Sequence, residues 1–414
     1  MSASSFLADY RAAAAEREAQ GVPALPLTAA ETQALTELLQ APPAGEEEFL
    51  LHLLSERIPP GVDEAAYVKA DWLSAVAQGR TTSPLVAPVE AVKLLATMIG
   101  GYNVGALIEL LSHADAAIAD AAATGLCRTL LVYDAYNDVL ELAASNTQAK
   151  RVIDSWANAE WFTAKPELPA EITVTVFKVE GETNTDDLSP ATHATTRPDI
   201  PLHATAMLET RMPGGLDLIA ELKQKGHPVA YVGDVVGTGS SRKSAINSVL
   251  WHTGTDIPHV PNKRSGGVVL GGKIAPIFFN TAEDSGALPI ECDVTALNSG
   301  DVITIRPYAG TIERAAGEAN AGDVVARFEL KPSTITDEVR AGGRIPLMIG
   351  RALTDKVRAQ LGLPASDLFI RPSAPADTGK GFTLAQKMVG KASGLPGVRP
   401  GTSCEPLMTL SLIH

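Results

Sequence analysis

The chain has 414 residues, of which 45% are hydrophobic, and a formal net charge of -14. A chain of this length can bury a large core and is expected to divide into two or three domains. The negative charge argues against a broadly basic nucleic-acid surface, and no apolar run approaches the roughly 20 residues that a membrane span requires. The three cysteines, Cys127, Cys292 and Cys404, include no Cys-x-x-Cys pair. This composition favours a cytosolic protein and gives no sign of a metal site in the sequence.

The first part of the chain, residues 1–165, is helical in pattern throughout. Apolar residues at helical spacing alternate with short Pro- and Gly-rich links, and Thr28 with Glu31 forms a capping box ahead of Leu35. Helices are expected at 6–19, 46–54, 63–77, 88–98, 104–111, 114–131, 135–144 and 147–156. Such an array fits antiparallel helix pairs stacked as a short solenoid, although it has no strict sequence period.

The pattern changes to a mixed α/β type after residue 165. Residues 172–180 alternate and are rich in branched side chains, which predicts a strand. Residues 181–201 are predicted to form one long polar loop. Its polar side chains suit a binding site held by a rigid scaffold. The residues concerned are Asn184, Asp186, Asp187 and Arg197.

The rest of this α/β part contains further predicted strands and helices. A helix is expected at 215–225, strands at 301–306 and 323–330, and helices at 336–341 and 347–361. From 372 to 381 the composition turns to Pro, Ala, Ser, Asp and Gly, which predicts a linker. One more amphipathic helix is expected at 382–391.

The most informative stretch is 229–251, which predicts a strand, a glycine turn and a helix. Gly237 and Gly239 allow the backbone to turn where a side chain would clash. The unpaired N–H groups and the dipole of the helix N-terminus favour an anion. Ser240, Ser241 and Arg242 stand at that point. The stretch therefore predicts an anion site made of a helix N-terminus, two hydroxyls and one cation.

A plainer alternative is that Ser240 or Ser241 only caps the helix and that Arg242 lies in solvent. Three sharper templates fail, because a dinucleotide fingerprint needs Gly at position 242, a phosphate loop needs Gly before Lys243, and a hydrolase elbow needs Gly two residues after its serine. Arg197, close to two prolines, is a candidate for a second anion clamp. The alternative for Arg197 is an ordinary surface arginine.

Several long stretches resemble the bacterial aconitate hydratase B family. They include Gly181-Glu-Thr-Asn-Thr-Asp-Asp-Leu-Ser-Pro190, Arg197-Pro-Asp-Ile-Pro-Leu-His203 and Tyr231-Val-Gly-Asp-Val-Val-Gly-Thr-Gly-Ser-Ser-Arg-Lys-Ser-Ala245. The resemblance implies an all-α HEAT-like helical solenoid over 1–165 and a mixed α/β swivel (β/β/α) domain over 166–371. It also implies a linker and the start of the cluster-bearing domain over 372–414, so that the chain corresponds to the first half of such an enzyme.

The resemblance also implies an activity and roles for the site residues. Members interconvert citrate and isocitrate through cis-aconitate, and 2-methylisocitrate is a further candidate substrate. Ser240 would exchange the proton, and the carboxylates would be held by Arg197, Ser240, Ser241 and Arg242. The family's [4Fe-4S] cluster binds to cysteines that this sequence does not contain. No metal ligand and no bound cluster are therefore expected in this chain, and activity of the chain alone is not expected.

Two other functions remain open from the sequence. The HEAT-like helical part of this family is linked to homodimer formation and to messenger RNA, although the acidic charge disfavours strong sequence-independent RNA binding. A third possibility is a stand-alone binder of tricarboxylates that uses Arg197 and Arg242.

Overall fold

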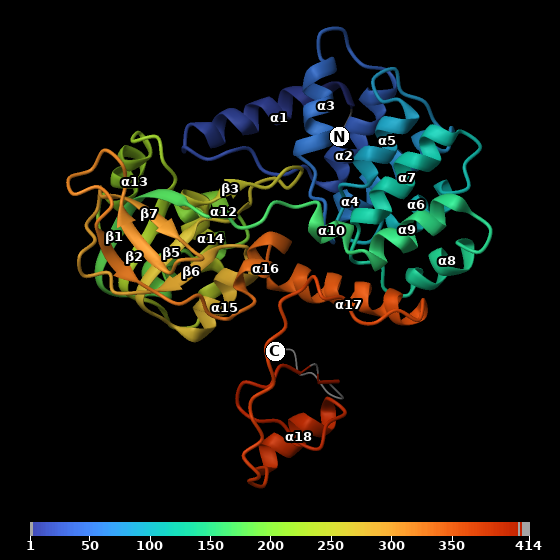
Figure 1. The fold of residues 1–414 in the computed structure, drawn as a ribbon. Helices are drawn as coiled ribbons and strands as arrows, with labels where there is room; N and C mark the ends of the chain where they lie inside the picture. The colour runs from blue at the N-terminus through green and yellow to red at the C-terminus, as the bar shows by residue number, and fades with distance from the viewer. Residues whose placement is uncertain (1–2, 405, 408–414) are drawn as a thin grey trace.

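The structure is a computed structural model that describes residues 3–404 and 406–407 (Figure 1). A helical part is followed by a mixed α/β part, which confirms this order of fold classes. The HEAT-like repeat, the swivel character and the domain bounds stay predictions, and residues 405 and 408–414 of the expected third segment lie outside the described residues.

The helical part contains ten helices in the described chain. They are α1 (Ala3–Glu18), α2 (Ala29–Gln40), α3 (Glu47–Glu56), α4 (Glu64–Ala77), α5 (Pro88–Leu95), α6 (Val104–Leu110), α7 (Ala116–Arg128), α8 (Ala135–Leu142), α9 (Thr147–Ala157) and α10 (Glu160–Thr163). The predicted capping box is present at α2, where the Thr28 hydroxyl accepts from the Glu31 amide at 3.3 Å and the Glu31 carboxylate accepts from the Thr28 amide at 2.8 Å.

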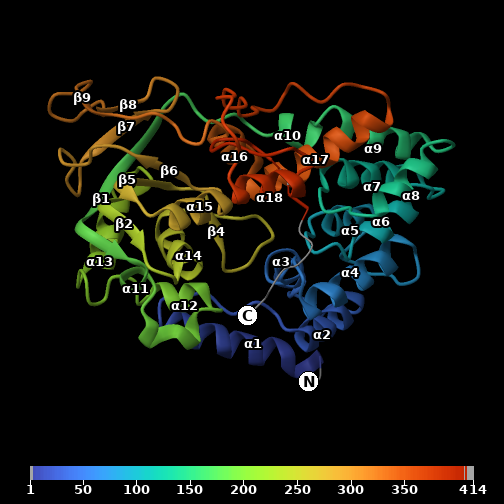
Figure 2. The ribbon, with the colours of Figure 1, turned by 90° about the horizontal axis from the view of Figure 1, so that it is seen from below.

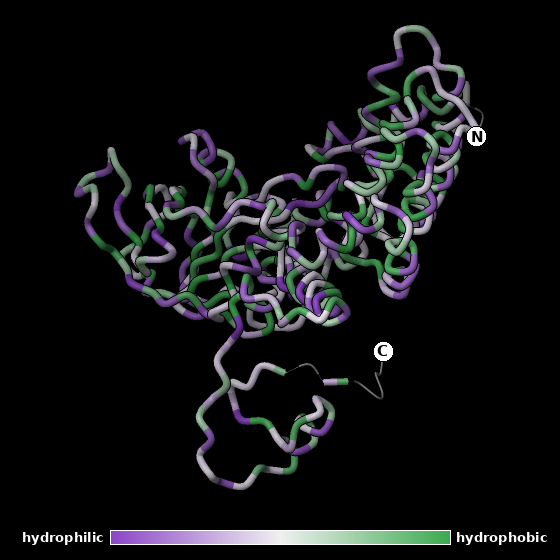
Figure 3. The backbone as a smooth tube through the Cα atoms, turned by 45° about the vertical axis from the view of Figure 1, so that its right-hand side comes forward, coloured by the Kyte–Doolittle hydropathy of each residue, from purple (hydrophilic) through white to green (hydrophobic). Residues whose placement is uncertain are grey.

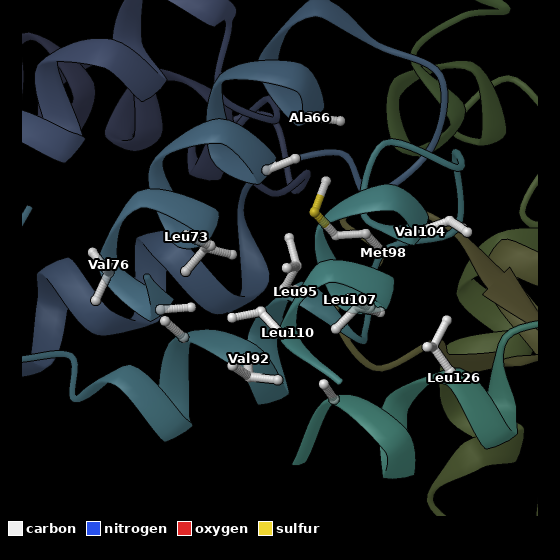
Figure 4. Close-up of a cluster of buried hydrophobic side chains, with 14 of the residues drawn as sticks. Ala66, Leu73, Val76, Val92, Leu95, Met98, Val104, Leu107, Leu110 and Leu126 are labelled. Atoms are coloured by element: carbon white, nitrogen blue, oxygen red, sulfur yellow. The ribbon is translucent and has the colours of Figure 1, made fainter. Parts of the chain in front are cut away.

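One continuous apolar core holds these helices together. Leu73 of α4, Leu95 of α5 and Leu107 of α6 are fully buried and belong to the same apolar cluster (Figure 4). Each apolar side chain that leaves water contributes about 1.5–3 kcal/mol, so a core of this kind is the main source of stability here. Two residues from far along the chain, Leu353 and Val357, belong to the same core.

The α/β part is built on a seven-stranded sheet with the order β6-β5-β2-β1-β7-β8-β9. Its strands are β1 (Ile172–Asn184), β2 (Val229–Thr238), β5 (Val268–Ile274), β6 (Leu288–Glu291), β7 (Val302–Arg306), β8 (Thr311–Arg314) and β9 (Val324–Arg327). A separate small ribbon pairs β3 (Thr255–Asp256) with β4 (Arg264–Ser265). The strands β1, β2, β5 and β6 are parallel, whereas β7, β8 and β9 continue the sheet in antiparallel pairs.

Helices connect the parallel strands. These are α11 (Thr185–Leu188), η1 (Ala191–Thr196), α12 (Ile200–Ala204) and α13 (Gly215–Lys223) between β1 and β2, α14 (Arg242–Thr253) after β2, and α15 (Pro276–Asp284) after β5. The expected single polar loop at 181–201 is wrong, because β1 continues to Asn184 and three short helical segments follow it.

Side chains alternate between the two faces of the sheet, as period-2 geometry requires. In β1, Phe177 packs with one buried cluster and Val176 with the other. In β2, Tyr231 and Val232 divide in the same way. Both faces of the central strands are therefore buried, and binding groups can gather only at the strand ends.

The chain returns to the helical part after the sheet is complete. Helix α16 (Ile335–Ala341) leads into α17 (Arg344–Gln360), which packs against α9. The indole of Trp161 donates to the Thr354 hydroxyl at 3.0 Å. Beyond α17, a segment carrying α18 (Leu384–Ala392) extends away from both bodies (Figure 3). Two helices therefore connect the α/β part to the helical part on opposite sides (Figure 2). One is α17, and the other is α1, whose Arg17 side chain bonds to Asp199 at the start of α12.

Candidate functional site

The predicted serine–arginine turn lies at the carboxyl edge of the parallel strands. β1 and β2 are neighbours, and their last paired residues are Asn184 and Thr238. The chain then turns at Gly239 and enters α14 at Arg242. Ligands of α/β sheets commonly bind at this edge, because loops and helix N-termini meet there. We call Arg197, Ser240, Ser241 and Arg242 the serine–arginine corner.

The two glycines of this turn have conformations that other residues avoid. Gly237 has φ +79° and Gly239 has φ +106°. A Cβ atom at position 237 would overlap the Phe278 ring, and one at position 239 would lie 2.5 Å from the Thr185 hydroxyl. That hydroxyl accepts a hydrogen bond from the Ser241 amide at 3.1 Å. Glycine is therefore required for the turn and for the contact that fixes Ser241.

Arg197 and Ser241 come together although they are far apart in sequence. The Arg197 guanidinium donates through Nη2 to the Ser241 hydroxyl at 3.0 Å. Ser241 is the N-cap residue of α14, but its side chain makes no capping hydrogen bond. This geometry does not support the alternative in which Ser241 only caps the helix, because the Ser241 hydroxyl binds an arginine.

The other two corner residues differ in exposure. Ser240 is exposed, and its hydroxyl has no hydrogen-bond partner within the part of the chain that the structure describes. Arg242 is half-buried and donates through Nη1 to the Ser240 carbonyl at 3.1 Å. Arg242 is thus held against the turn and does not extend freely into solvent.

Positive charge at the corner is not neutralised by nearby carboxylates. Among residues 3–404 and 406–407, neither Arg197 nor Arg242 forms an ion pair, and the Nε of Arg197 is buried without an acceptor. A guanidinium has five N–H donors, so the corner retains donors for an incoming anion. The N-terminal dipole of α14 adds to the same field.

The polar residues at the end of β1 and at the start of α11 have a structural role. The Asn184 side chain accepts from the amides of Asp186 and Asp187 at 2.8 and 2.9 Å, and the Asp187 carboxylate accepts from the Asn184 amide at 2.9 Å. This reciprocal arrangement is a capping box for α11. The side chains of Asn184 and Asp187 therefore stabilise α11 beside the corner and do not extend into the corner.

Sequence reasoning missed a buried histidine beside the corner. His203 is 2% exposed and contacts the hydroxyls of Ser189 and Thr196 at 2.7 and 2.9 Å. Burial lowers the pKa of His203, and the positive charge of Arg197 lowers it further. No spacing signal links these residues, since only the fold brings them together.

The described residues do not form a metal-binding group. No set of three or more His, Cys, Asp or Glu side chains in that part of the chain could hold a metal ion. Cys127 and Cys292 are buried as free thiols, and burial raises the pKa of both. These side chains do not fit an iron–sulfur cluster. In the same residues no helix has the length and apolar character needed to cross a bilayer.

The fold and the corner define a class of protein: a helical domain joined to an α/β domain that presents two arginines at a helix N-terminus. A family model described as aconitate hydratase 2 N-terminus matches residues 174–382, and one described as aconitate B N-terminal domain matches residues 9–162. The chain belongs to the aconitate hydratase B family.

Curated relatives extend this match to nearly the whole chain. Aconitate hydratase B of Synechocystis is 70% identical over 404 residues, which cover 98% of this chain and 46% of the relative. The proteins of that name from Pseudomonas aeruginosa and Escherichia coli are 61% and 58% identical, and each match covers 98% of this chain and 47% of the relative. The chain therefore spans about half the length of these relatives.

Proposed function

We propose that this chain is the amino-terminal part of an aconitate hydratase that interconverts citrate and isocitrate through cis-aconitate, with 2-methylisocitrate as a further substrate. The observation that carries the proposal is the corner itself: a half-buried Arg197 with an unpartnered Nε, set against a helix N-terminus beside an exposed serine. Membership of the family supplies the reaction class.

The chemistry of the substrate suits each of these groups. A tricarboxylate needs fixed cations, and a guanidinium holds a carboxylate through two parallel hydrogen bonds. We assign this role to Arg197 and Arg242, with the Ser241 hydroxyl as a further contact. A proton next to a carboxylate leaves more readily when the developing negative charge is held in place. We assign the proton transfer to Ser240, which directly follows Gly239 and is exposed.

The chain alone is proposed to be inactive. In the family a [4Fe-4S] cluster polarises the hydroxyl that leaves, and the side chains described here do not assemble a site for it. Binding of citrate by this chain alone would also lack the contacts that the rest of the enzyme supplies. We place the complete reaction in the cytosol, with this chain supplying one wall of the substrate site.

A split-enzyme assay tests the proposal. The chain is mixed with the remaining part of the Synechocystis relative after anaerobic iron–sulfur reconstitution, and conversion of cis-aconitate is followed by absorbance. We expect turnover only in the mixture, with an Arg242→Ala chain raising the KM at least tenfold, equivalent to about 1.4 kcal/mol of lost binding. Lys263→Ala, which removes a cation outside the corner, is the matched control. Turnover by the chain alone at the rate of the mixture would contradict the proposal.

A second candidate function is homodimer formation through the helical part. Tyr67 and Tyr102 stack edge to face with ring centroids 5.4 Å apart, and both are exposed. Exposed Ile99 lies nearby and lines an apolar cavity of about 330 Å³, together with Ile345 of α17. Apolar surface of this kind favours protein contact over contact with messenger RNA. Light scattering of the chain and of a Tyr67→Ser, Ile99→Ser double variant tests this: we expect a dimer that the variant abolishes, and a monomer at high concentration excludes it.

A further inference from the structure

The buried imidazole of His203 connects the two halves of the serine–arginine corner. His203 lies on α12, and its two ring nitrogens face different segments. Nδ1 is 2.9 Å from the Thr196 hydroxyl, and Thr196 directly precedes Arg197. Nε2 is 2.7 Å from the Ser189 hydroxyl, which follows α11. The His203 side chain therefore bonds both to the segment that carries Arg197 and to the segment that follows α11, beside α14.

The connection continues from Ser189 to the start of α14. The Ser189 hydroxyl donates to the Ser244 hydroxyl at 2.7 Å, and the Ser244 hydroxyl donates to the Ser241 carbonyl at 3.0 Å. Each hydroxyl has one proton to donate, so this order of donors leaves the Ser189 oxygen as an acceptor for His203. The Nε2 of His203 must then carry a proton.

The other ring nitrogen is free to accept. The Thr196 hydroxyl is 2.8 Å from the His193 carbonyl and 2.9 Å from Nδ1 of His203. The Thr196 hydroxyl has one proton and can donate it either to the His193 carbonyl or to Nδ1. With the ring neutral and protonated on Nε2, Nδ1 is the acceptor and the carbonyl gives up that bond. Burial and the neighbouring Arg197 charge both lower the pKa of His203, which agrees with a neutral ring. The charged groups that face the ring are Arg197 and, when protonated, His193.

We propose that His203, as a neutral Nε2-protonated imidazole, is a positioning residue that holds Arg197 and Ser241 at a fixed separation before substrate arrives. Its consequence for catalysis rests on the proposed function. The hydroxyl chain ends on the Ser241 carbonyl, and the Ser240 hydroxyl has no part in it within the described chain. His203 therefore acts on geometry and does not relay a proton to Ser240. A displacement of about 1 Å at such a site lowers turnover by about a hundredfold.

Two substitutions separate the two bonds of the ring. The amide nitrogen of glutamine can occupy the place of Nε2, whereas the shorter asparagine reaches only the place of Nδ1. His203→Asn therefore removes the bond to Ser189, and His203→Gln retains it. His252→Asn is the matched control, because His252 also lies between α12 and α14 but bonds to the Ala204 carbonyl at 2.9 Å and not to the corner.

The readout is the nuclear magnetic resonance spectrum of the complete chain without ligand. We expect His203→Asn to shift the Ser241 amide and Arg197 Nε–H signals several times further than His252→Asn does. We expect His203→Gln to restore the Ser241 signal toward its position in the unmodified chain. Equal shifts in His203→Asn and His252→Asn, or unchanged corner signals in His203→Asn, would overturn the proposal.

A second measurement decides the matter even if His203→Asn fails to fold. Nitrogen-15 shifts of the His203 ring in the unmodified chain report which nitrogen carries the proton. We expect a proton on Nε2 alone at neutral pH, and a proton on Nδ1 would contradict the proposed bonding. Both readouts are taken without substrate, so they stand or fall separately from the aconitate hydratase activity. In the split enzyme, a loss of kcat in His203→Asn that is restored in His203→Gln would connect the bonding of His203 to the catalytic activity.

Discussion

The helical part and the α/β part are held together in different ways. In the helical part, side chains such as Leu73 and Leu107 fill a continuous apolar core, and Lys69 and Asn103 are buried there as well. In the α/β part, the apolar clusters lie on the two faces of the sheet, while its carboxyl edge is organised by hydrogen bonds around Ser241 and His203. Stability of the helical part therefore comes mainly from buried side-chain volume, whereas the site depends on backbone turns and polar bonds.

The largest effect is expected at the turn of the α/β part. Gly237→Ala should cost about 4 kcal/mol, because the left-handed backbone strain adds to an overlap with the Phe278 ring. Gly214→Ala is the control: Gly214 has a similar φ of +81°, but its Cβ would meet no atom within 4 Å. The control should cost only about 1 kcal/mol. Urea unfolding of both variants measures this, and equal losses would show that the ring contact is unimportant.

A somewhat smaller effect is expected in the core of the helical part. Leu73→Ala should lower the free energy of unfolding by about 3 kcal/mol, because Leu73 is fully buried and leaves a cavity. Leu25→Ala, at a site that is 52% exposed, should change it by less than about 0.5 kcal/mol. The Arg197 and Ser241 signals should stay in place in both variants. A shift of those signals in Leu73→Ala would show that core and corner are not separate.

An ion pair joins the two parts at their boundary. Arg17 of α1 forms a bidentate pair with Asp199, the N-cap residue of α12, with one N···O distance of 2.9 Å. Both side chains are mostly buried, so Arg17→Ala should cost about 2 kcal/mol and leave Asp199 without its partner. Arg11 pairs with Glu46 within the helical part and is more exposed.

Arg11→Ala serves as the control for that pair. It should reduce stability less than Arg17→Ala and should not affect protease cleavage between the two parts. We expect faster cleavage near residue 199 in Arg17→Ala only. Equal cleavage in both variants would mean that Arg17 does not join the helical part to α12.

The smallest effect is a pH dependence at the contact between α15 and α16. Burial and the Glu338 carboxylate raise the pKa of Glu283 to about 8, against an ordinary value of 4.5, although Arg344 opposes this. The folded state therefore binds a proton that the unfolded state releases, and stability should fall as pH rises from about 4.5 to about 8.

Glu283→Gln tests this pH dependence. Removing the ionisable group should flatten the fall and make the variant more stable than the unmodified chain near pH 8, by about 1 kcal/mol or more. Asp284 and Arg344 face the same place and keep their own pair. Glu329→Gln, which alters an exposed carboxylate, is the control. Urea midpoints that fall equally with pH in the unmodified chain and in Glu283→Gln would contradict the assignment.

Local patterns in the sequence predicted most of the fold. Thr28 and Glu31 signalled the start of α2, and the alternation from residue 172 signalled β1. The error at 181–201 has a physical cause: β1 runs on to Asn184 because its neighbour β2 extends to Thr238. Asn184 and Asp199 then cap short helices. The sequence contains these capping residues, but the high content of turn-forming residues in the same segment predicted a loop.

The short strands β6 and β8 and the polar network were harder to predict. Each strand has four residues, and its pairing is set by tertiary contacts and not by local propensity. Ser240, Ser241 and Arg242 were found because they follow the glycine turn directly. Ser189, His203 and Ser244 could not be found in this way, since a lone histidine and two serines have no characteristic spacing. The glycine turn and the helix predict the position of an anion site, whereas the residues that position the site are identified only from the fold.

The proton-transfer role of Ser240 is tested most directly by the turnover of cis-aconitate in a full-length chimera, in which this chain replaces the matching part of the Synechocystis relative. We expect the unmodified chimera to approach the activity of that relative. Ser240→Ala should lower kcat by about a thousandfold with little change in KM, whereas Ser299→Ala, a serine outside the corner, should not. A Ser240→Ala chimera that keeps kcat within about tenfold would contradict the assignment of the proton transfer to this corner.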